Sequence, residues 1–167
     1  LRQFGIKPGD RVAAYMTNIP EAVTALLACS SIGAIWSSCS PDFGTHSVLD
    51  RLAQIEPKVL FCVDGYCYKG KAFSRKDEIK KIIDALPSID KVIYLPYMDK
   101  TDTALPVSGA ILWQDLMDQD EIPAEAFIFE QVPFDHPLWI LFSSGTTGLP
   151  KAIVHGHGGI IIEQMKL

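Results

Sequence analysis

Nine consecutive residues of this chain combine hydroxyls, glycines and a lysine at close spacing. The segment is Ser143–Lys151, with the sequence SSGTTGLPK, and it directly follows the apolar run Leu138–Phe142. An apolar run that ends in a Gly/Ser/Thr segment predicts a buried strand that delivers a loop to one edge of a sheet. Glycines let backbone N–H groups turn toward a ligand, hydroxyls add donors and a lysine adds positive charge, so the loop suits phosphate oxygens. The pattern predicts a nucleoside triphosphate site; the plainer alternative is a surface loop without a ligand.

A Walker-type phosphate loop does not match this spacing. That loop needs Gly-x4-Gly-Lys-Ser/Thr, with the lysine directly after the second glycine and at the start of a helix. Here Gly145 and Gly148 are too close together, and Pro150 stands before Lys151. The proline biases Leu149 toward extended geometry, so we expect no helix to begin at the lysine. The P-loop NTPase class is therefore disfavoured.

The loop and the residues after it resemble the phosphate-binding signature of the adenylate-forming enzymes. This superfamily includes acyl-CoA synthetases, luciferases and peptide-synthetase adenylation domains. The signature commonly carries glycine after its lysine, whereas Ala152 stands there in this sequence. Ala152, His155 and the run Gly156–Gly159 resemble the acetoacetate–CoA ligase branch of the superfamily. Four further segments resemble the same branch in the expected order: Ser40–Gly44, Val48–Arg51, Gln54–Phe61 and Asp64–Tyr66.

The resemblance implies an α/β fold, with a mostly parallel sheet and flanking helices. Residues 1–167 would be part of the large N-terminal AMP-binding domain of such an enzyme. The adenine and acyl pockets, and a C-terminal domain with its catalytic lysine, would lie outside this chain. We therefore expect an internal fragment that is inactive by itself.

The resemblance also implies a reaction. A full-length enzyme of this kind is an ATP-dependent, AMP-forming ligase that activates an acid as an acyl-adenylate and transfers it to CoA. Its small-molecule substrates would be acetoacetate, ATP and CoA, with Mg²⁺ accompanying ATP. Two alternatives remain open: an acetate- or propionate-type acyl-CoA synthetase, and a non-catalytic truncated chain that serves as a binding or interaction domain.

Within the loop, the resemblance implies contacts to the β- and γ-phosphates of ATP. Ser144, Thr146 and Thr147 are the best candidate hydroxyl donors, and the two glycines would give mobility and close backbone approach. Lys151 would either add charge or be a solvated lysine at the loop's exit. Ser143 would either bind phosphate or satisfy backbone groups at the end of the strand. No catalytic residue is expected here; the ATP phosphate-binding set is Ser143, Ser144, Gly145, Thr146, Thr147, Gly148 and Lys151.

The segment Tyr68–Lys71 is a second, weaker candidate. At the corresponding place, similar acetyl-CoA synthetases carry an Arg-x-Gly-Arg stretch that contacts CoA phosphates. Lys71 matches the second arginine, while Tyr68 replaces the first and removes a bidentate phosphate partner. Lys71 is therefore a candidate CoA phosphate contact, and the alternative is a solvated basic turn before a helix.

We expect no metal ion to be bound by the side chains of this chain. His155 and His157 lack an accompanying cluster of ligands, so they are interpreted as loop or packing histidines. Asp42 is interpreted as a turn residue, and Asp50 as a salt-bridge partner of Arg51 on a helix surface.

Alternating strand and helix patterns indicate a parallel sheet. A helix is predicted from Pro20 to the residue before Gly33, and another is predicted to begin after an N-cap at Thr45. Ser74 and Asp77 resemble a capping box for a third helix. Further helices are predicted over 113–117 and from about Gly159; the predicted strands are 10–16, 34–37, 59–63, 91–95 and 138–142.

Composition limits the possible partners and location. The chain has 167 residues, of which 48% are hydrophobic, and a net charge of -5, which disfavours a nucleic-acid role. No apolar run approaches the ~20 residues of a membrane span, and the N-terminus does not resemble a signal peptide. Cys29 and Cys62 fall in apolar segments, which favours buried, reduced thiols and a cytosolic protein without membrane partners.

Overall fold

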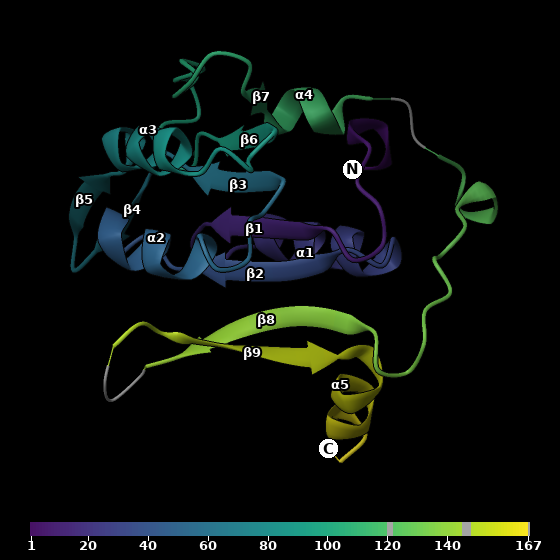
Figure 1. The fold of residues 1–167 in the computed structure, drawn as a ribbon. Coiled ribbons are helices and arrows are strands. Elements are labelled where there is room, and N and C mark those ends of the chain that lie inside the picture. The colour runs from purple at the N-terminus through teal and green to yellow at the C-terminus, as the bar shows by residue number, and fades with distance from the viewer. Residues whose placement is uncertain (120–121, 145–147, 167) are drawn as a thin grey trace.

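A seven-stranded sheet with helices on both faces forms the centre of the fold (Figure 1). The structure is a computed structural model that describes residues 1–119, 122–144 and 148–166. In spatial order, the strands of the sheet are β7 (Ile111–Leu112), β6 (Lys91–Leu95), β3 (Val59–Val63), β1 (Arg11–Tyr15), β2 (Ile35–Cys39), β8 (Pro137–Ser143) and β9 (Lys151–Gly156). All neighbouring pairs are parallel except β8 and β9. The predicted mostly parallel α/β fold is therefore confirmed.

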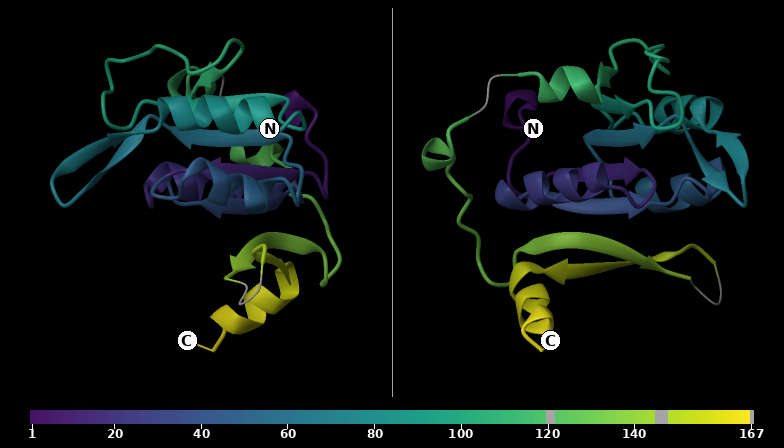
Figure 2. Two further views of the ribbon diagram at one scale, coloured as in Figure 1. Left: turned by 60° about the vertical axis from the view of Figure 1, so that its left-hand side comes forward. Right: turned by 180° about the vertical axis from the view of Figure 1, so that it is seen from behind.

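Helices cover the sheet on two sides. The helices are α1 (Pro20–Ser31), α2 (Thr45–Leu52), α3 (Lys76–Ala85), α4 (Trp113–Met117) and α5 (His157–Gln164), with 3-10 turns η1 (Arg2–Phe4) and η2 (Ala124–Ala126). Figure 1 shows α2 and α3 in front of the sheet, and the reversed view in Figure 2 brings α1 forward. The helix predicted from Pro20 to the residue before Gly33 is α1, which ends one residue earlier, at Ser31, and the helix predicted over 113–117 is α4.

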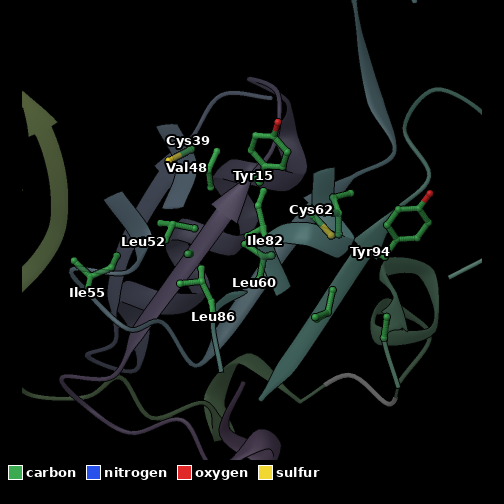
Figure 3. Close-up of a cluster of buried hydrophobic side chains, with 14 of the residues drawn as sticks. Tyr15, Cys39, Val48, Leu52, Ile55, Leu60, Cys62, Ile82, Leu86 and Tyr94 are labelled. Atoms are coloured by element: carbon green, nitrogen blue, oxygen red, sulfur yellow. The ribbon is translucent and has the colours of Figure 1, made fainter. Parts of the chain in front are cut away.

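The strand β3 shows why the central strands have no polar alternation. Every residue of Val59–Val63 is buried. Leu60 and Cys62 belong to the apolar cluster that includes residues of α2 and α3, whereas Val59, Phe61 and Val63 belong to the cluster on the α1 side. A strand in a parallel sheet that is covered on both faces needs apolar side chains in both directions. Figure 3 shows the first cluster, with Leu52 and Ile82 converging on Leu60.

Two hairpins were not expected from the sequence. The first, β4 (Gly65–Tyr68) and β5 (Lys71–Ser74), is antiparallel and separate from the main sheet. The second is formed by β8 and β9, where Lys151–Gly156 pairs with Pro137–Ser143. Whether a segment forms a strand depends on the strand beside it as well as on its own residue types. Segments of mixed polar and apolar residues such as these are therefore hard to recognise as strands from sequence.

Two predicted helix caps are wrong. Thr45 is the first residue of α2, and Gly44 occupies the N-cap position. Ser74 is the last residue of β5 and pairs with Gly65, so Arg75 becomes the N-cap residue of α3.

The last helix, α5, begins at His157 rather than near Gly159. No helix in the described ranges is long and apolar enough to span a bilayer.

Candidate functional site

The segment 143–151 begins at the edge of the sheet where the parallel strands end. Strand β8 runs parallel to β2, with Trp139 opposite Trp36, and Ser37 Oγ donates a hydrogen bond to the carbonyl oxygen of Ile140 at 2.9 Å. This bond ties β8 to the interior of the sheet. Ligands of open parallel sheets bind beyond the carboxyl ends of the strands. The fold therefore places the segment where such a ligand is expected.

The two ends of the segment 143–151 lie in paired strands. Ser143 is the last residue of β8 and pairs with Lys151, the first residue of β9. Ser143 is half-buried, while Ser144 and Lys151 are exposed. Gly148 has a φ of 117°, a backbone conformation that residues with a Cβ rarely adopt. The remaining candidates Gly145, Thr146 and Thr147 lie outside the described residues, so their predicted role is unaltered.

Gln54, to which the sequence assigned no role of its own, contacts this segment. The amide nitrogen Nε2 of Gln54, just after α2, donates to the carbonyl oxygen of Pro150 at 2.9 Å. The same nitrogen donates to the carbonyl oxygen of Asp50 at 2.6 Å. Pro150 directly precedes Lys151, the first residue of β9, so the exit of the loop, meaning Pro150 and Lys151, is attached to the end of α2. These partners are 96 positions apart, and no local pattern reveals such a contact.

The turn 40–44 follows β2 at the same edge of the sheet. The buried Tyr15 hydroxyl lies 2.6 Å from the carbonyl oxygen of Phe43 and 3.1 Å from that of Pro41. Arg75 Nε donates to the carbonyl oxygen of Pro41 at 2.6 Å. Burial, the largest influence, raises the pKa of Tyr15 to about 12, so its hydroxyl stays protonated at neutral pH. The turn is thus fixed from β1 and from the start of α3.

The Lys71 candidate lies on the separate hairpin. Tyr68 and Lys71 are directly opposite each other at its tip, and both are exposed. Lys69 and Gly70 form the connection with φ values of 49° and 75°, as a tight turn between antiparallel strands requires. Figures 1 and 2 show this hairpin on the side of the sheet at which strand β8 ends and strand β9 begins. Lys71 is thus accessible to a ligand at that side.

His155 and His157, which follow the loop 143–151, pack against the rings of other side chains. The ring of His155 lies edge-on to Trp139 with 6.3 Å between centroids. The ring of His157 lies 5.7 Å from that of His136. Among the described residues, no group of three His, Cys, Asp or Glu side chains is placed to hold a metal ion.

The expected pairing of Asp50 with Arg51 is wrong. Asp50 lies 3.0 Å from Nδ1 of His46, one helical turn earlier. Arg51 donates to the carbonyl oxygen of Ser47 at 2.6 Å, and its guanidinium lies 4.7 Å from the centre of the Phe43 ring. Adjacent residues on a helix point in different directions, whereas residues four apart lie on one face. Arg51 therefore supports the turn 40–44 rather than its neighbour.

Comparisons with known proteins find similar sequences and a similar structure over almost the whole chain. A family model described as "AMP-binding enzyme" matches residues 1–167. The chain is 45% identical to an acetoacetyl-CoA synthetase of Macaca fascicularis and 46% identical to one of Rhizobium meliloti (strain 1021), over 99% of this chain and 25% of each relative. A solved structure of the acetoacetyl-CoA synthetase from Streptomyces lividans matches with a TM-score of 0.91 and 51% identity, over 99% of this chain and 24% of that one. The chain spans about a quarter of the length of these relatives.

Proposed function

This chain belongs to the AMP-binding enzyme family, and from that membership we propose that it is part of an acetoacetate–CoA ligase. In the first step, a carboxylate oxygen of acetoacetate attacks the α-phosphorus of ATP and pyrophosphate leaves. In the second, the sulfur of CoA attacks the carbonyl carbon of the acetoacetyl-adenylate and AMP leaves. The observation that carries the proposal is the similarity to acetoacetyl-CoA synthetases over 99% of the chain.

Residues 1–167 form part of the large N-terminal AMP-binding domain in this proposal. The C-terminal domain and the acyl pocket belong to other parts of the full-length enzyme. The enzyme is assigned to the cytosol, where thiols stay reduced; the three buried free cysteines Cys29, Cys39 and Cys62 support that assignment. Its substrates are small molecules.

The loop 143–151 acts in the adenylation step by positioning the triphosphate. Negative charge accumulates on pyrophosphate as it leaves, and donors already aimed at its oxygens stabilise that charge. The hydroxyls of Ser144, Thr146 and Thr147 supply such donors, with Ser143 at the strand end. Gly145 and Gly148 allow close backbone approach, and Lys151 adds positive charge. None of these groups needs to exchange a proton or form a covalent bond with the substrate.

Two further ligands belong to the proposal. Mg²⁺ arrives with ATP and binds phosphate oxygens, which are the hard ligands it prefers. The ammonium group of Lys71 pairs with a phosphate of CoA, and the exposure of Lys71 at the tip of its hairpin supports this role. Lysine contributes there as a point charge rather than as a bidentate partner.

The phosphate role is tested by replacing Thr146 and Thr147 with alanine in the full-length enzyme. Exchange of labelled pyrophosphate into ATP, which reports adenylation alone, is expected to slow by roughly ten- to a hundredfold per lost bond to a charged group. The preference for acetoacetate over acetate should remain. Ser108→Ala, which removes an exposed hydroxyl on another loop, is the control. Unchanged exchange rates in both threonine variants would remove the two residues from the site.

Two further experiments test which acid is the substrate and whether residues 1–167 are active by themselves. A full-length enzyme that adenylates acetate or propionate far better than acetoacetate would contradict the assigned acid. Residues 1–167 by themselves are expected to catalyse no exchange, because the acyl pocket and the catalytic lysine of the resembling enzymes lie elsewhere. Exchange by the isolated chain would contradict that expectation.

A further inference from the structure

We propose that Gln54 is a positioning residue that fixes the exit of the phosphate loop for ATP binding. The inference rests on the proposed function, because it assigns the loop 143–151 to the triphosphate. It adds a residue that lies outside the Ser/Gly/Thr motif and that reaches the loop only through the tertiary fold. The juxtaposition is the end of α2 against the peptide between Pro150 and Lys151.

The contact uses the donor capacity of the glutamine amide at two carbonyl groups. Nε2 of Gln54 donates to the carbonyl oxygen of Asp50 at 2.6 Å and to that of Pro150 at 2.9 Å. A primary amide nitrogen carries two hydrogens, so one nitrogen can serve both acceptors. The bond to Asp50 holds the side chain against its own helix, and this fixes the direction in which the second hydrogen points.

The backbone that carries Gln54 is held by the central strand. Arg11, the first residue of β1, donates from Nε to the carbonyl oxygen of Ile55 at 2.5 Å and from a terminal nitrogen to that of Glu56 at 3.1 Å. Ile55 itself is buried in the core cluster beside α2 and α3. The turn after α2 is therefore attached to the sheet at two carbonyl groups, and Gln54 is presented from a fixed support.

The exit of the loop is then constrained from two directions. The β-ladder pairs Lys151 with Ser143, and Gln54 holds the preceding carbonyl group of Pro150. Ordering a flexible segment on a ligand costs conformational entropy, and each constraint present before binding reduces that cost. The bond therefore favours ATP binding, and its loss should raise KM for ATP more than it lowers kcat.

The test uses two substitutions at this position in the full-length enzyme. Gln54→Ala removes the side chain, and Gln54→Glu keeps its size but replaces both N–H donors with an acceptor. We expect either change to raise KM for ATP in pyrophosphate–ATP exchange by about three- to tenfold, the range for one neutral hydrogen bond, with kcat changed less than twofold. The matched control is Gln114→Ala, because the exposed Gln114 amide also donates within its own helix, to Asp118 at 2.7 Å.

A second measurement is independent of activity. Trypsin cleaves after Lys151, and cleavage there in the absence of ATP should be faster in both Gln54 variants than in the wild type and in Gln114→Ala. Excess ATP should restore protection in the wild type at lower concentration than in the variants. Thermal unfolding of the same variants separates an effect at the loop exit from a loss of global stability, because global unfolding would also speed cleavage.

The outcomes separate the two proposals. A wild-type enzyme that exchanges no pyrophosphate with any short acid would overturn the proposed function. A wild-type enzyme that does so, together with Gln54 variants of unchanged KM for ATP and unchanged cleavage at Lys151, would overturn the role of Gln54 alone. Variants that lose thermal stability but keep KM would assign Gln54 to the stability of the fold and would likewise overturn the positioning role.

Discussion

His157, at the start of α5, joins two segments through backbone and ring contacts. Its backbone N–H donates to the carbonyl oxygen of His136 at 3.0 Å, and the two imidazole rings lie 5.7 Å apart. Its Nε2 is buried without a hydrogen-bond partner among the described residues. Burial, and after it the neighbouring His136, lowers the pKa of the His157 imidazole. The folded protein therefore favours the neutral ring.

Acidification should consequently destabilise the protein through His157. Because the pKa is lower in the folded state, the unfolded chain takes up a proton near pH 6.5, before the folded chain does. The stabilising contribution is present above about pH 6.5 and is lost as the pH falls below it. We expect the Tm to fall between about pH 7.5 and 5.5, and to fall less in His157→Gln. His155→Gln is the control, and an identical pH slope in wild type and His157→Gln would refute the assignment.

At the scale of elements, α5 is fitted against the segment before β8 by a glycine. A Cβ at Gly158 would lie 2.3 Å from ring carbons of Phe134, and the Gly158 N–H donates to the Phe134 carbonyl oxygen at 2.8 Å. Gly159, the next residue, has no atom within 4 Å of the corresponding position. The two glycines therefore differ in packing although both lie in the same helix.

Alanine substitutions at these glycines should have opposite effects. Gly158→Ala should lower the free energy of unfolding by about 1–3 kcal/mol, because the methyl group displaces the Phe134 ring. Gly159→Ala should raise it by roughly 0.5–1 kcal/mol, because alanine restricts the unfolded chain and favours helix. Urea unfolding measures both. If Gly158→Ala is as stable as Gly159→Ala, the close approach of α5 to Phe134 is wrong.

Side chains from three elements hold the backbone of neighbouring loops at the edge where the parallel strands end. Tyr15 from β1, Arg75 before α3 and Gln54 after α2 each donate a hydrogen bond to a carbonyl group of a neighbouring loop. Loops that carry ligands are mobile unless their backbone groups are satisfied by rigid elements. Three elements of the sheet and its helices thus fix the turn 40–44 and the exit of the loop 143–151.

At the scale of the whole molecule, the two apolar clusters decide the accessibility of the thiols. Cys29 and Cys62 lie in opposite clusters, as expected for buried thiols, and Cys39 is buried with Cys62. Cys67 is exposed on β4. Burial raises the pKa of Cys29 to about 12 and that of Cys39 to about 11, which leaves little reactive thiolate at neutral pH.

Thiol labelling of the folded protein should therefore modify Cys67 and spare Cys29, Cys39 and Cys62. All four should react after denaturation, because the protection comes from burial. Peptide mapping by mass spectrometry after labelling with and without guanidinium identifies the sites. Cys67→Ser should abolish the fast reaction within this chain, and rapid modification of Cys62 in the folded protein would contradict the described core.

The sequence predicted the elements whose stability comes from their own pattern. The run Val59–Val63 and the strand 91–95 have the predicted bounds, and the helix from Pro20 ends before Gly33. Continuous apolar runs and helix-breaking residues carry this information locally. The cap at Ser74 failed because Ser74 pairs with Gly65 across a hairpin that its own neighbours did not indicate.

The residue types and spacing of 143–151 also led, by themselves, to the prediction of a phosphate ligand, because phosphate recognition depends on local residue types, whereas the class of reaction came from the resemblance of this motif to the adenylate-forming enzymes. Only the tertiary structure decided how that loop is held. The strand β9 needs β8 beside it, Arg51 stacks on Phe43 instead of pairing with Asp50, and Gln54 meets Pro150 across 96 positions. Such contacts depend on where distant segments lie after the sheet has formed, and no local periodicity or motif encodes that arrangement.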